Sequence, residues 1–219
     1  MPAPKRARRP KSDASPRDRA IDAAATLGAD RGWVRTRLTD IAAAAHLTLA
    51  ELHAEFPTKA ALVRAFVQRV DAQMLAGLPE SDTGDSARDR LFGVIMRRLD
   101  VLRPHRRAVL AFAAAALADP ATACALGAAQ RRSLAWMLEA AGLSAAGVSG
   151  AVRRAGLHAI LVSTLWVWSR DPSPDLERTM AHLDRRLRQV EDLYAFLEPF
   201  RRPRYGAAQA KPEPAKPES

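Results

Sequence analysis

Threonine, arginine and lysine side chains stand near the two ends of residues 36–59, and hydroxyl, small and acidic side chains lie between them. The threonine and arginine side chains at 36–39 and the lysine at 59 can donate hydrogen bonds to phosphate oxygens. Side chains after position 48 can meet base edges, because glutamate accepts from cytosine N4 and alanine packs on the thymine methyl group. These side chains could therefore contact double-stranded DNA if the elements that hold them form a DNA-binding motif. The candidate residues are Thr36, Arg37, Thr39, Thr48, Leu49, Ala50, Glu51, His53 and Lys59.

Two short helices with a tight turn are needed to hold these side chains in place. The apolar face expected for the first helix consists of Leu38, Ile41, Ala42 and Ala45. A second helix is expected from Leu49 to Phe56, with Thr48 as its N-cap and Pro57 as its stop. Thr58 can cap the helix that follows. This arrangement predicts a helix-turn-helix, whose second helix enters a groove of DNA.

Residues 20–62 resemble the N-terminal segment of the TetR family of bacterial repressors. The stretch AIDAAATLGADRGW (20–33) is similar to the family's first helix and ends in the glycine–aromatic pair Gly32 and Trp33. The stretch FPTKAAL (56–62) is similar to the family's exit from the recognition helix. The resemblance implies an all-α protein, with a three-helix DNA-binding domain followed by a larger helical bundle. It also implies a homodimeric transcriptional regulator that responds to a small molecule.

Several positions depart from the family pattern. His46 stands where the family usually has a glycine in the turn, and Gly28 stands where it packs a large aromatic side chain. In the recognition helix the departures are Leu49 for lysine, His53 for tyrosine, and the acidic residues Glu51 and Glu55. These changes weaken the DNA-contact chemistry. The alternative is therefore a motif that serves only as a small packed domain.

Composition indicates a helical protein with an uneven charge distribution. The 219 residues are 48% hydrophobic but only 5% aromatic, and alanine is abundant, which favours closely packed helices. The net charge is +10; residues 1–19 carry seven Lys and Arg against two Asp, and residues 201–219 carry five against two Glu. Basic tails favour a polyanionic partner, either nucleic acid or anionic lipid. The alternative is a tail that only aids solubility.

Motifs typical of catalysis and of metal or cofactor binding do not occur in the sequence. There is no GxSxG, no phosphate-binding glycine-rich loop, no HExxH and no Cys/His metal spacing, so we expect neither enzyme activity nor a cofactor. Cys124 is the only cysteine, which excludes an internal disulfide. The N-terminal segment has no apolar signal region, and the most apolar run, 155–169, is shorter than a membrane span. We expect a cytoplasmic protein.

The expected organisation has four parts. They are a disordered basic arm (1–14), a helix-turn-helix domain (15–78), a ligand-binding and dimerisation domain (79–202) and a disordered tail (203–219). Helices in the larger domain are expected over about 88–102, 105–117, 120–142, 145–169 and 176–197. The helix over 145–169 is apolar almost all round, which predicts burial on several sides.

Large side chains set among many alanines predict a cavity in the larger domain. The candidate pocket residues are Met96, Phe112, Trp136, Met137 and Trp166, with Leu117 and Trp168 as further members. The alternative is that they form ordinary core. Since no charged group clearly belongs to this set, an apolar or amphipathic effector is expected, with isoprenoid lipids among the options.

The last helix has the clearest repeat in the sequence, with apolar residues at alternating spacings of four and three. This heptad seam consists of Leu176, Met180, Leu183, Leu187, Val190, Tyr194 and Leu197. The pattern predicts pairing with another helix. We expect that helix to belong to a second subunit, in a four-helix dimer interface; the alternative is packing within the chain.

Residues 97–109 and 171–186 are similar to a second family, the accessory lipid-binding protein of ubiquinone biosynthesis. That family has a TetR-like architecture and binds isoprenoid lipids instead of DNA. Where it has a C-terminal amphipathic membrane-binding helix, this sequence after Tyr205 is polar and proline-rich. We therefore expect a TetR-type regulator. A lipid-binding protein of quinone metabolism is the alternative, and a purely structural dimerisation module is a third interpretation.

Overall fold

The structure is a computed structural model that describes residues 14–78 and 85–201, with side chains described as far as Glu191. Within these ranges all regular structure is helical, so the predicted all-α class is confirmed. The elements are α1 (Pro16–Arg31), α2 (Leu38–Ala44), α3 (Leu49–Glu55), α4 (Lys59–Ala76), α5 (Ala87–Leu102), η1 (Arg103–His105), α6 (Arg106–Ala116), α7 (Pro120–Ala140), α8 (Gly147–Trp168) and α9 (Glu177–Arg201). The basic arm and the C-terminal tail lie outside the described residues.

Short polar side chains explain where several of these helices begin. The hydroxyl oxygens of Ser15, Thr58 and Ser86 each accept a backbone N–H from the first turn of their helix, at 3.1 Å. The Asp119 carboxylate does the same for α7, accepting from the backbone of Ala121 and Thr122 at 3.1 Å. These bonds satisfy donors that a helix start leaves without an intrahelical partner.

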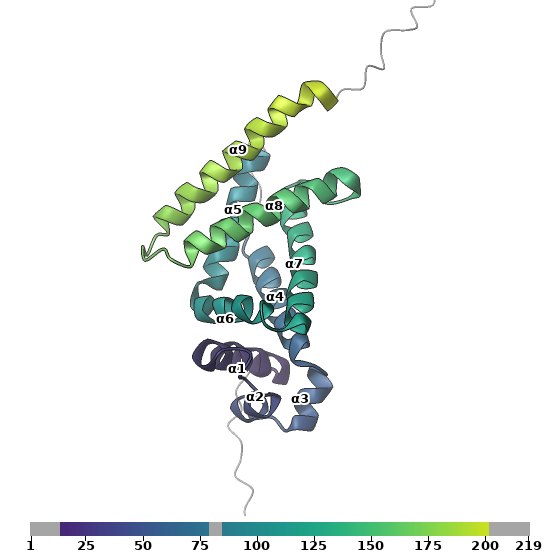
Figure 1. Ribbon diagram of the computed structural model, residues 1–219, viewed down its shortest axis with the longest axis vertical. Helices are drawn as coiled ribbons and strands as arrows, with labels where there is room; N and C mark the ends of the chain where they lie inside the picture. The colour runs from purple at the N-terminus through teal and green to yellow at the C-terminus, as the bar shows by residue number, and fades with distance from the viewer. Residues whose placement is uncertain (1–13, 79–84, 202–219) are drawn as a thin grey trace, which may run out of the picture.

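The helices form one continuous core. In Figure 1, α2 and α3 make one end of the molecule, α1 lies above them against α6, and α4 rises from this end into the bundle beside α7. The chain then reverses after α8, and α9 packs back on α8 and α5. One cluster of buried apolar residues runs from Ala20 to Leu187, so it includes both sides of the predicted boundary at residue 78.

The heptad seam of α9 faces its own chain, which corrects the expectation that it forms a subunit interface. Leu176, Leu183 and Leu187 are buried against α5 and α8, and Met180 and Val190 are half-buried. The side chains of Tyr194 and Leu197 lie outside the described residues. The sequence pattern is a real packing seam, but its partner helices are intramolecular.

The helix α8 was expected to be buried on several sides, but one of its faces is exposed. Its inner face is buried, with Leu157, Leu161 and Trp168 in the core, but large apolar side chains on its outer face are exposed. Val148 is 84% exposed and Trp166 is 60% exposed. None of the described helices is both long enough and apolar enough to cross a membrane.

Candidate DNA-reading surface and ligand cavity

The turn between α2 and α3 closes through an unusual backbone conformation. The backbone N–H of Leu47 donates to the carbonyl of Ala42 at 2.8 Å, and the N–H of His46 donates to that of Ala43 at 3.1 Å. To make this turn, His46 takes a φ of +55°. Glycine adopts this left-handed region without steric cost, whereas a side chain there is strained. The turn geometry of a helix-turn-helix is therefore kept at a cost in backbone strain.

The first turn of α3 is held by a reciprocal capping box. The hydroxyl of Thr48 accepts the backbone N–H of Glu51 at 3.2 Å, and the Glu51 carboxylate accepts the backbone N–H of Thr48 at 2.7 Å and its hydroxyl at 2.9 Å. Thr48 is therefore the N-cap, as the sequence predicted. The Glu51 carboxylate is bound to the start of its own helix, which reduces its availability for base contact.

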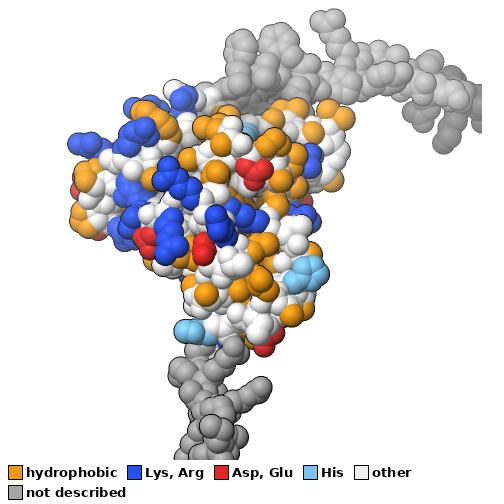
Figure 2. Space-filling model, turned by 60° about the horizontal axis from the view of Figure 1, so that its bottom comes forward, with side chains coloured by type: hydrophobic (Ala, Val, Ile, Leu, Met, Phe, Trp, Pro, Cys, Tyr) orange, Lys and Arg blue, Asp and Glu red, His pale blue; other side chains and the backbone are white. Residues whose placement is uncertain are grey.

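The outer face of α3 is exposed and carries no lysine or arginine. Leu49 is 52% exposed, and Ala50, His53 and Ala54 are exposed beside it. Leu52 lies on the opposite face, fully buried. In Figure 2 the end of the molecule formed by α2 and α3 comes forward, and it shows few blue side chains, whereas Lys and Arg gather on the neighbouring surface. An approaching phosphate therefore meets little positive charge on α3 itself.

The predicted phosphate contacts fall into two groups. Arg37 and Thr39 are exposed and free to reach DNA. Thr36 is only 2% exposed and its hydroxyl donates to the Gly32 carbonyl at 3.0 Å, so it contributes to packing. Lys59 donates to the carbonyls of Trp33 and Val34. The expected phosphate contacts of Thr36 and Lys59 are thus corrected, because both groups are engaged within the chain.

Two further exposed arginines, missed in the sequence analysis, lie on the elements that flank the α2–α3 pair. Arg35 lies in the loop between α1 and α2, and Arg64 lies in the second turn of α4; both are exposed. The closeness of Arg35 to Arg37 in the sequence is a signal that could have identified it. Arg64 carries no such signal, because its orientation depends on how α4 packs.

Trp33 connects the helix-turn-helix to the rest of the bundle. Its ring is buried, and its indole N–H donates to the hydroxyl of Thr122 on α7 at 3.3 Å. Phe112 of α6 packs edge-on against it, with ring centroids 5.0 Å apart. A Cβ atom at Gly28 would lie 3.5 Å from both rings. The space that an aromatic side chain would need at position 28 is therefore filled by Trp33 and Phe112.

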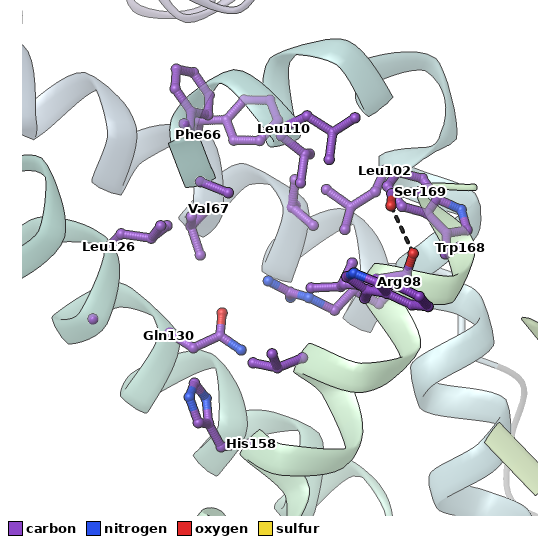
Figure 3. Close-up of a pocket in the computed structure, with 18 of the residues that line it drawn as sticks. Phe66, Val67, Arg98, Leu102, Leu110, Leu126, Gln130, His158, Trp168 and Ser169 are labelled. Atoms are coloured by element: carbon purple, nitrogen blue, oxygen red, sulfur yellow. Dashed lines mark hydrogen bonds between the residues drawn. The ribbon is translucent and has the colours of Figure 1, made fainter. Parts of the chain in front are cut away.

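A cavity of about 560 Å³ lies between α4, α5, α6, α7 and α8. Apolar side chains make most of its wall, including Phe66 and Val67 of α4 and Leu126 of α7 (Figure 3). Of the predicted pocket residues, Phe112 and Trp166 line it, as does Trp168. The other predicted pocket residues, Met96, Trp136, Met137 and Leu117, lie outside the lining. Met137 is fully buried in the core, Met96 is half-buried, and Trp136 and Leu117 are exposed.

The polar groups of the cavity wall were not identified from the sequence. The Arg98 guanidinium is buried at the wall and forms an ion pair with Asp71, whose carboxylate also accepts the Ser133 hydroxyl at 2.6 Å. In Figure 3, Gln130 and His158 lie on one side of the cavity and Arg98 on the other. A volume of this size with few polar groups suits a largely apolar small molecule. The described residues contain no cluster arranged to hold a metal ion.

The segment that resembles the lipid-binding family has a structural role at the start of α9. Asp171 is buried, and its carboxylate accepts the backbone N–H and hydroxyl of Ser173, at 3.1 and 2.6 Å. It also accepts both groups of Thr179, at 2.9 and 2.7 Å. Burial on its own raises the pKa of Asp171, but these hydrogen bonds hold it well below its usual value. The segment fixes the turn between α8 and α9.

Comparison with known families confirms the resemblance to both families, although the second match includes residues 171–186 and not residues 97–109. The family described as bacterial regulatory proteins, tetR family, matches residues 20–66, and the family described as COQ9 matches residues 134–194. Comparison with curated proteins returned no match. Residues 20–66 are thus similar to the bacterial regulatory proteins of the tetR family.

Solved structures agree with this fold. A TetR transcriptional regulator from Nitrosomonas europaea is 27% identical, with a TM-score of 0.65 over 80% of this chain and 97% of that chain. A TetR transcriptional regulator from Rhodococcus sp. RHA1 is 20% identical, with a TM-score of 0.60 over 80% and 95% of the two chains. GusR of Salmonella enterica is 22% identical, with a TM-score of 0.57 over 80% and 94%. The chain has the fold of TetR transcriptional regulators.

Proposed function

We propose that this protein is a homodimeric, cytoplasmic transcriptional regulator of the TetR type, and that it is not an enzyme. In this proposal α3 enters a groove of operator DNA, and a small molecule in the cavity changes the DNA affinity. The observation that carries the proposal is the position of α4. This helix begins at Lys59, directly after the recognition helix, and its residues Phe66, Val67 and Val70 line the cavity. A ligand in the cavity would contact α4, the helix that follows the recognition helix α3. This contact allows the ligand cavity and the DNA-binding surface to be coupled.

The DNA contacts proposed here are mostly electrostatic. Arg35, Arg37 and Arg64 are exposed on the elements that flank α3 and could bind phosphates, while the exposed Leu49, Ala50 and His53 would face the bases. The basic segment 1–14 adds a sequence-independent term. With so few phosphate contacts from residues 35–64, we expect modest affinity, and we expect segment 1–14 to supply most of its dependence on salt.

The proposed effector is a neutral, largely apolar molecule. Asp71 already balances the charge of Arg98 within the wall, and the second lining arginine, Arg170, is exposed and lies over the Trp166 ring, so the buried part of the wall offers a charged ligand no partner of its own. A single acceptor oxygen directed at Arg98 or Gln130 would suit the polar part of the lining. Isoprenoid lipids belong to this class.

A second candidate function is lipid binding in quinone metabolism without DNA binding. Two observations favour it: α3 carries no lysine or arginine, and residues 134–194 match the COQ9 family. The two functions predict different co-purified molecules and different responses of a DNA complex.

The test combines extraction with DNA binding. Small molecules bound to the purified protein are extracted, identified by mass spectrometry and added back to a complex with the protein's own upstream DNA. If the protein is a ligand-controlled regulator, its affinity for the upstream DNA should fall or rise as the molecule is added. A bound polyprenyl quinone, together with no preference for any duplex, would favour the second function.

A further inference from the structure

A buried ion pair sets the charge of the cavity wall. Arg98, on α5, is buried and lines the cavity, and its guanidinium donates through Nη1 to the carboxylate of Asp71 on α4. Asp71 is buried as well, but it is not among the residues that line the cavity. The carboxylate therefore lies behind the wall, where it neutralises the charge of Arg98 without entering the space that a ligand would fill.

Asp71 is held in this place by a second helix. The hydroxyl of Ser133, on α7, is buried and donates to Asp71 Oδ1 at 2.6 Å, and the same oxygen accepts from Arg98. Donors from α5 and α7 thus fix the carboxylate, and one of these donors is charged. Because a buried charge without a partner is costly, Asp71 and Arg98 depend on each other to remain ionised in the core.

The other cationic groups of the lining stand at the rim of the cavity. No aspartate or glutamate is among the described lining residues, whose arginines are Arg98 and Arg170. Arg170 is exposed, and its guanidinium carbon lies 4.2 Å from the centroid of the Trp166 ring. His158 is exposed as well. Arg98 is therefore the charged donor that a buried ligand meets, and Asp71 balances that charge.

A neutral acceptor and an anion meet this pair differently. A guanidinium has five N–H donors, and Asp71 is the partner of Arg98 among the described residues. The remaining donors suit a carbonyl oxygen, which gains a hydrogen bond from a charged group while the pair stays neutral. A carboxylate in the same place would lose its hydration to a wall whose buried cation is already balanced, and the nearby charge of Asp71 would repel it.

We propose that Asp71 is a specificity-determining residue of the cavity and that it acts from behind the wall. By neutralising Arg98 it selects ligands that carry a neutral carbonyl oxygen, such as esters, ketones and amides, and it excludes carboxylates of the same shape. Without the charge of Asp71, Arg98 faces the cavity as an unbalanced cation, and the same cavity accepts acids. This inference rests on the proposed ligand cavity and names the class of effector that the cavity takes.

The experiment compares two molecules of nearly the same shape, 1-naphthaleneacetamide and 1-naphthaleneacetate, at neutral pH, where the second is an anion. Their affinities are measured by displacement of the neutral fluorophore N-phenyl-1-naphthylamine. Asp71→Asn removes the charge of the side chain and keeps its shape. The matched control is Asp22→Asn, which removes a carboxylate that pairs with Arg69 outside the lining of this cavity. Circular dichroism checks the helix content of each variant.

We expect the wild type and Asp22→Asn to bind the amide at least about tenfold more tightly than the acid. In Asp71→Asn the affinity for the acid should rise at least about tenfold, so that the preference is lost or reversed. An unchanged preference in Asp71→Asn would overturn the inference. A wild type that binds the acid as tightly as the amide would also overturn it, as would a fluorophore that neither molecule displaces.

These outcomes are distinct from a failure of the proposed function. The titrations contain no DNA, so a result that overturns the role of Asp71 leaves a ligand-controlled regulator in place. A wild type that binds no fluorophore would instead remove the ligand cavity itself, and the inference with it.

A second variant keeps the test decisive if Asp71→Asn does not fold. Asp71→Asn combined with Arg98→Met removes both charges, and neutral replacement of a whole buried ion pair is often tolerated. Relative to the fluorophore, the double variant should bind the amide about fivefold more weakly, because the donor is gone, and should show no gain for the acid. An amide affinity equal to that of the wild type would mean that Arg98 recognises no carbonyl oxygen, and would overturn the inference.

Discussion

The ammonium group of Lys59 lies 4.6 Å from the centroid of the Trp33 ring and donates to the Trp33 carbonyl. Lys59 is the first residue of α4, and Trp33 follows α1, so the contact fixes the loop that leads into α2. Burial lowers the pKa of Lys59, and the charge of Asp119 offsets part of this effect. The lysine that the sequence suggested as a phosphate contact is a structural clamp.

Replacing Lys59 should therefore affect stability first. We expect Lys59→Met to lower the free energy of unfolding by about 2 kcal/mol, because it removes a cation–π contact and hydrogen bonds from a charged donor. Denaturant unfolding measures the change. The control is Arg37→Met, which should leave stability unchanged within about 0.5 kcal/mol while weakening DNA binding. A Lys59→Met protein as stable as the wild type would show that the clamp contributes nothing.

The left-handed backbone at His46 predicts that a substitution there raises the free energy of unfolding. His46→Gly relieves a strain of about 1–2 kcal/mol, part of which is offset by the greater freedom of glycine in the unfolded chain, so we expect a net gain of roughly 0.5–1 kcal/mol. The control His53→Gly, within α3, should instead cost about 0.5 kcal/mol. Thermal unfolding of both variants decides the point. A loss of stability in His46→Gly would mean that the imidazole makes a compensating contact.

Substitutions at Gly28 test how the helix-turn-helix is joined to the rest of the helical bundle. A Cβ there meets Phe112 and Trp33 at an ordinary contact distance of 3.5 Å, so Gly28→Ala should stabilise the protein by roughly 0.5–1 kcal/mol through helix propensity. Gly28→Phe should destabilise it by about 1–3 kcal/mol through overpacking. Adding Phe112→Ala to Gly28→Phe should recover part of that loss in the same unfolding assay. If it recovers none, the two side chains do not compete for one space.

Asp171 predicts a dependence of stability on pH. Its pKa is lower in the folded than in the unfolded state, so its contribution is present above the unfolded pKa of about 3.9 and is lost as pH falls through the folded value. We expect Asp171→Asn to lower the free energy of unfolding by about 2 kcal/mol at pH 7. This difference should shrink below about pH 4. Urea unfolding at pH 7, 5 and 3.5 measures it, and a difference that is equal at all three values would contradict this origin.

The sequence was a good guide to local structure and a weaker one to contacts between distant segments. The threonine caps and Pro57 marked the ends of the short helices, because capping depends on neighbouring residues. The heptad of α9 marked a true seam, but a repeat says nothing about whether the partner helix belongs to the same chain. Leu183 of α9 is fully buried within the chain, whereas the large apolar side chains that are exposed lie on α8 and not on α9.

The candidate sites show the same limit. Lys59 binds backbone carbonyls, and no sequence pattern reveals which carbonyls lie near a side chain. Trp136 and Trp166 look alike in the sequence, yet only Trp166 reaches the cavity, because α7 and α8 turn different faces to it. Asp71 of α4 and Arg98 of α5 form an ion pair although they are 27 residues apart in the sequence. No local sequence pattern predicted this contact.

The basic N-terminal segment and the folded reading surface should contribute differently to DNA binding. Deleting residues 1–14 should weaken binding to every duplex and flatten its salt dependence, because counterion release follows the number of phosphates neutralised. Preference for one sequence should survive the deletion, since α3 and its surroundings read the bases.

The central claim is tested most directly by a fluorescence titration of the protein against its own upstream duplex and a scrambled duplex of equal length, over a series of salt concentrations. The account predicts tighter binding to the upstream duplex at every salt concentration, with the preference retained after deletion of residues 1–14. Equal and weak affinity for both duplexes, lost when residues 1–14 are removed, would contradict a DNA-reading function and favour the lipid-binding one.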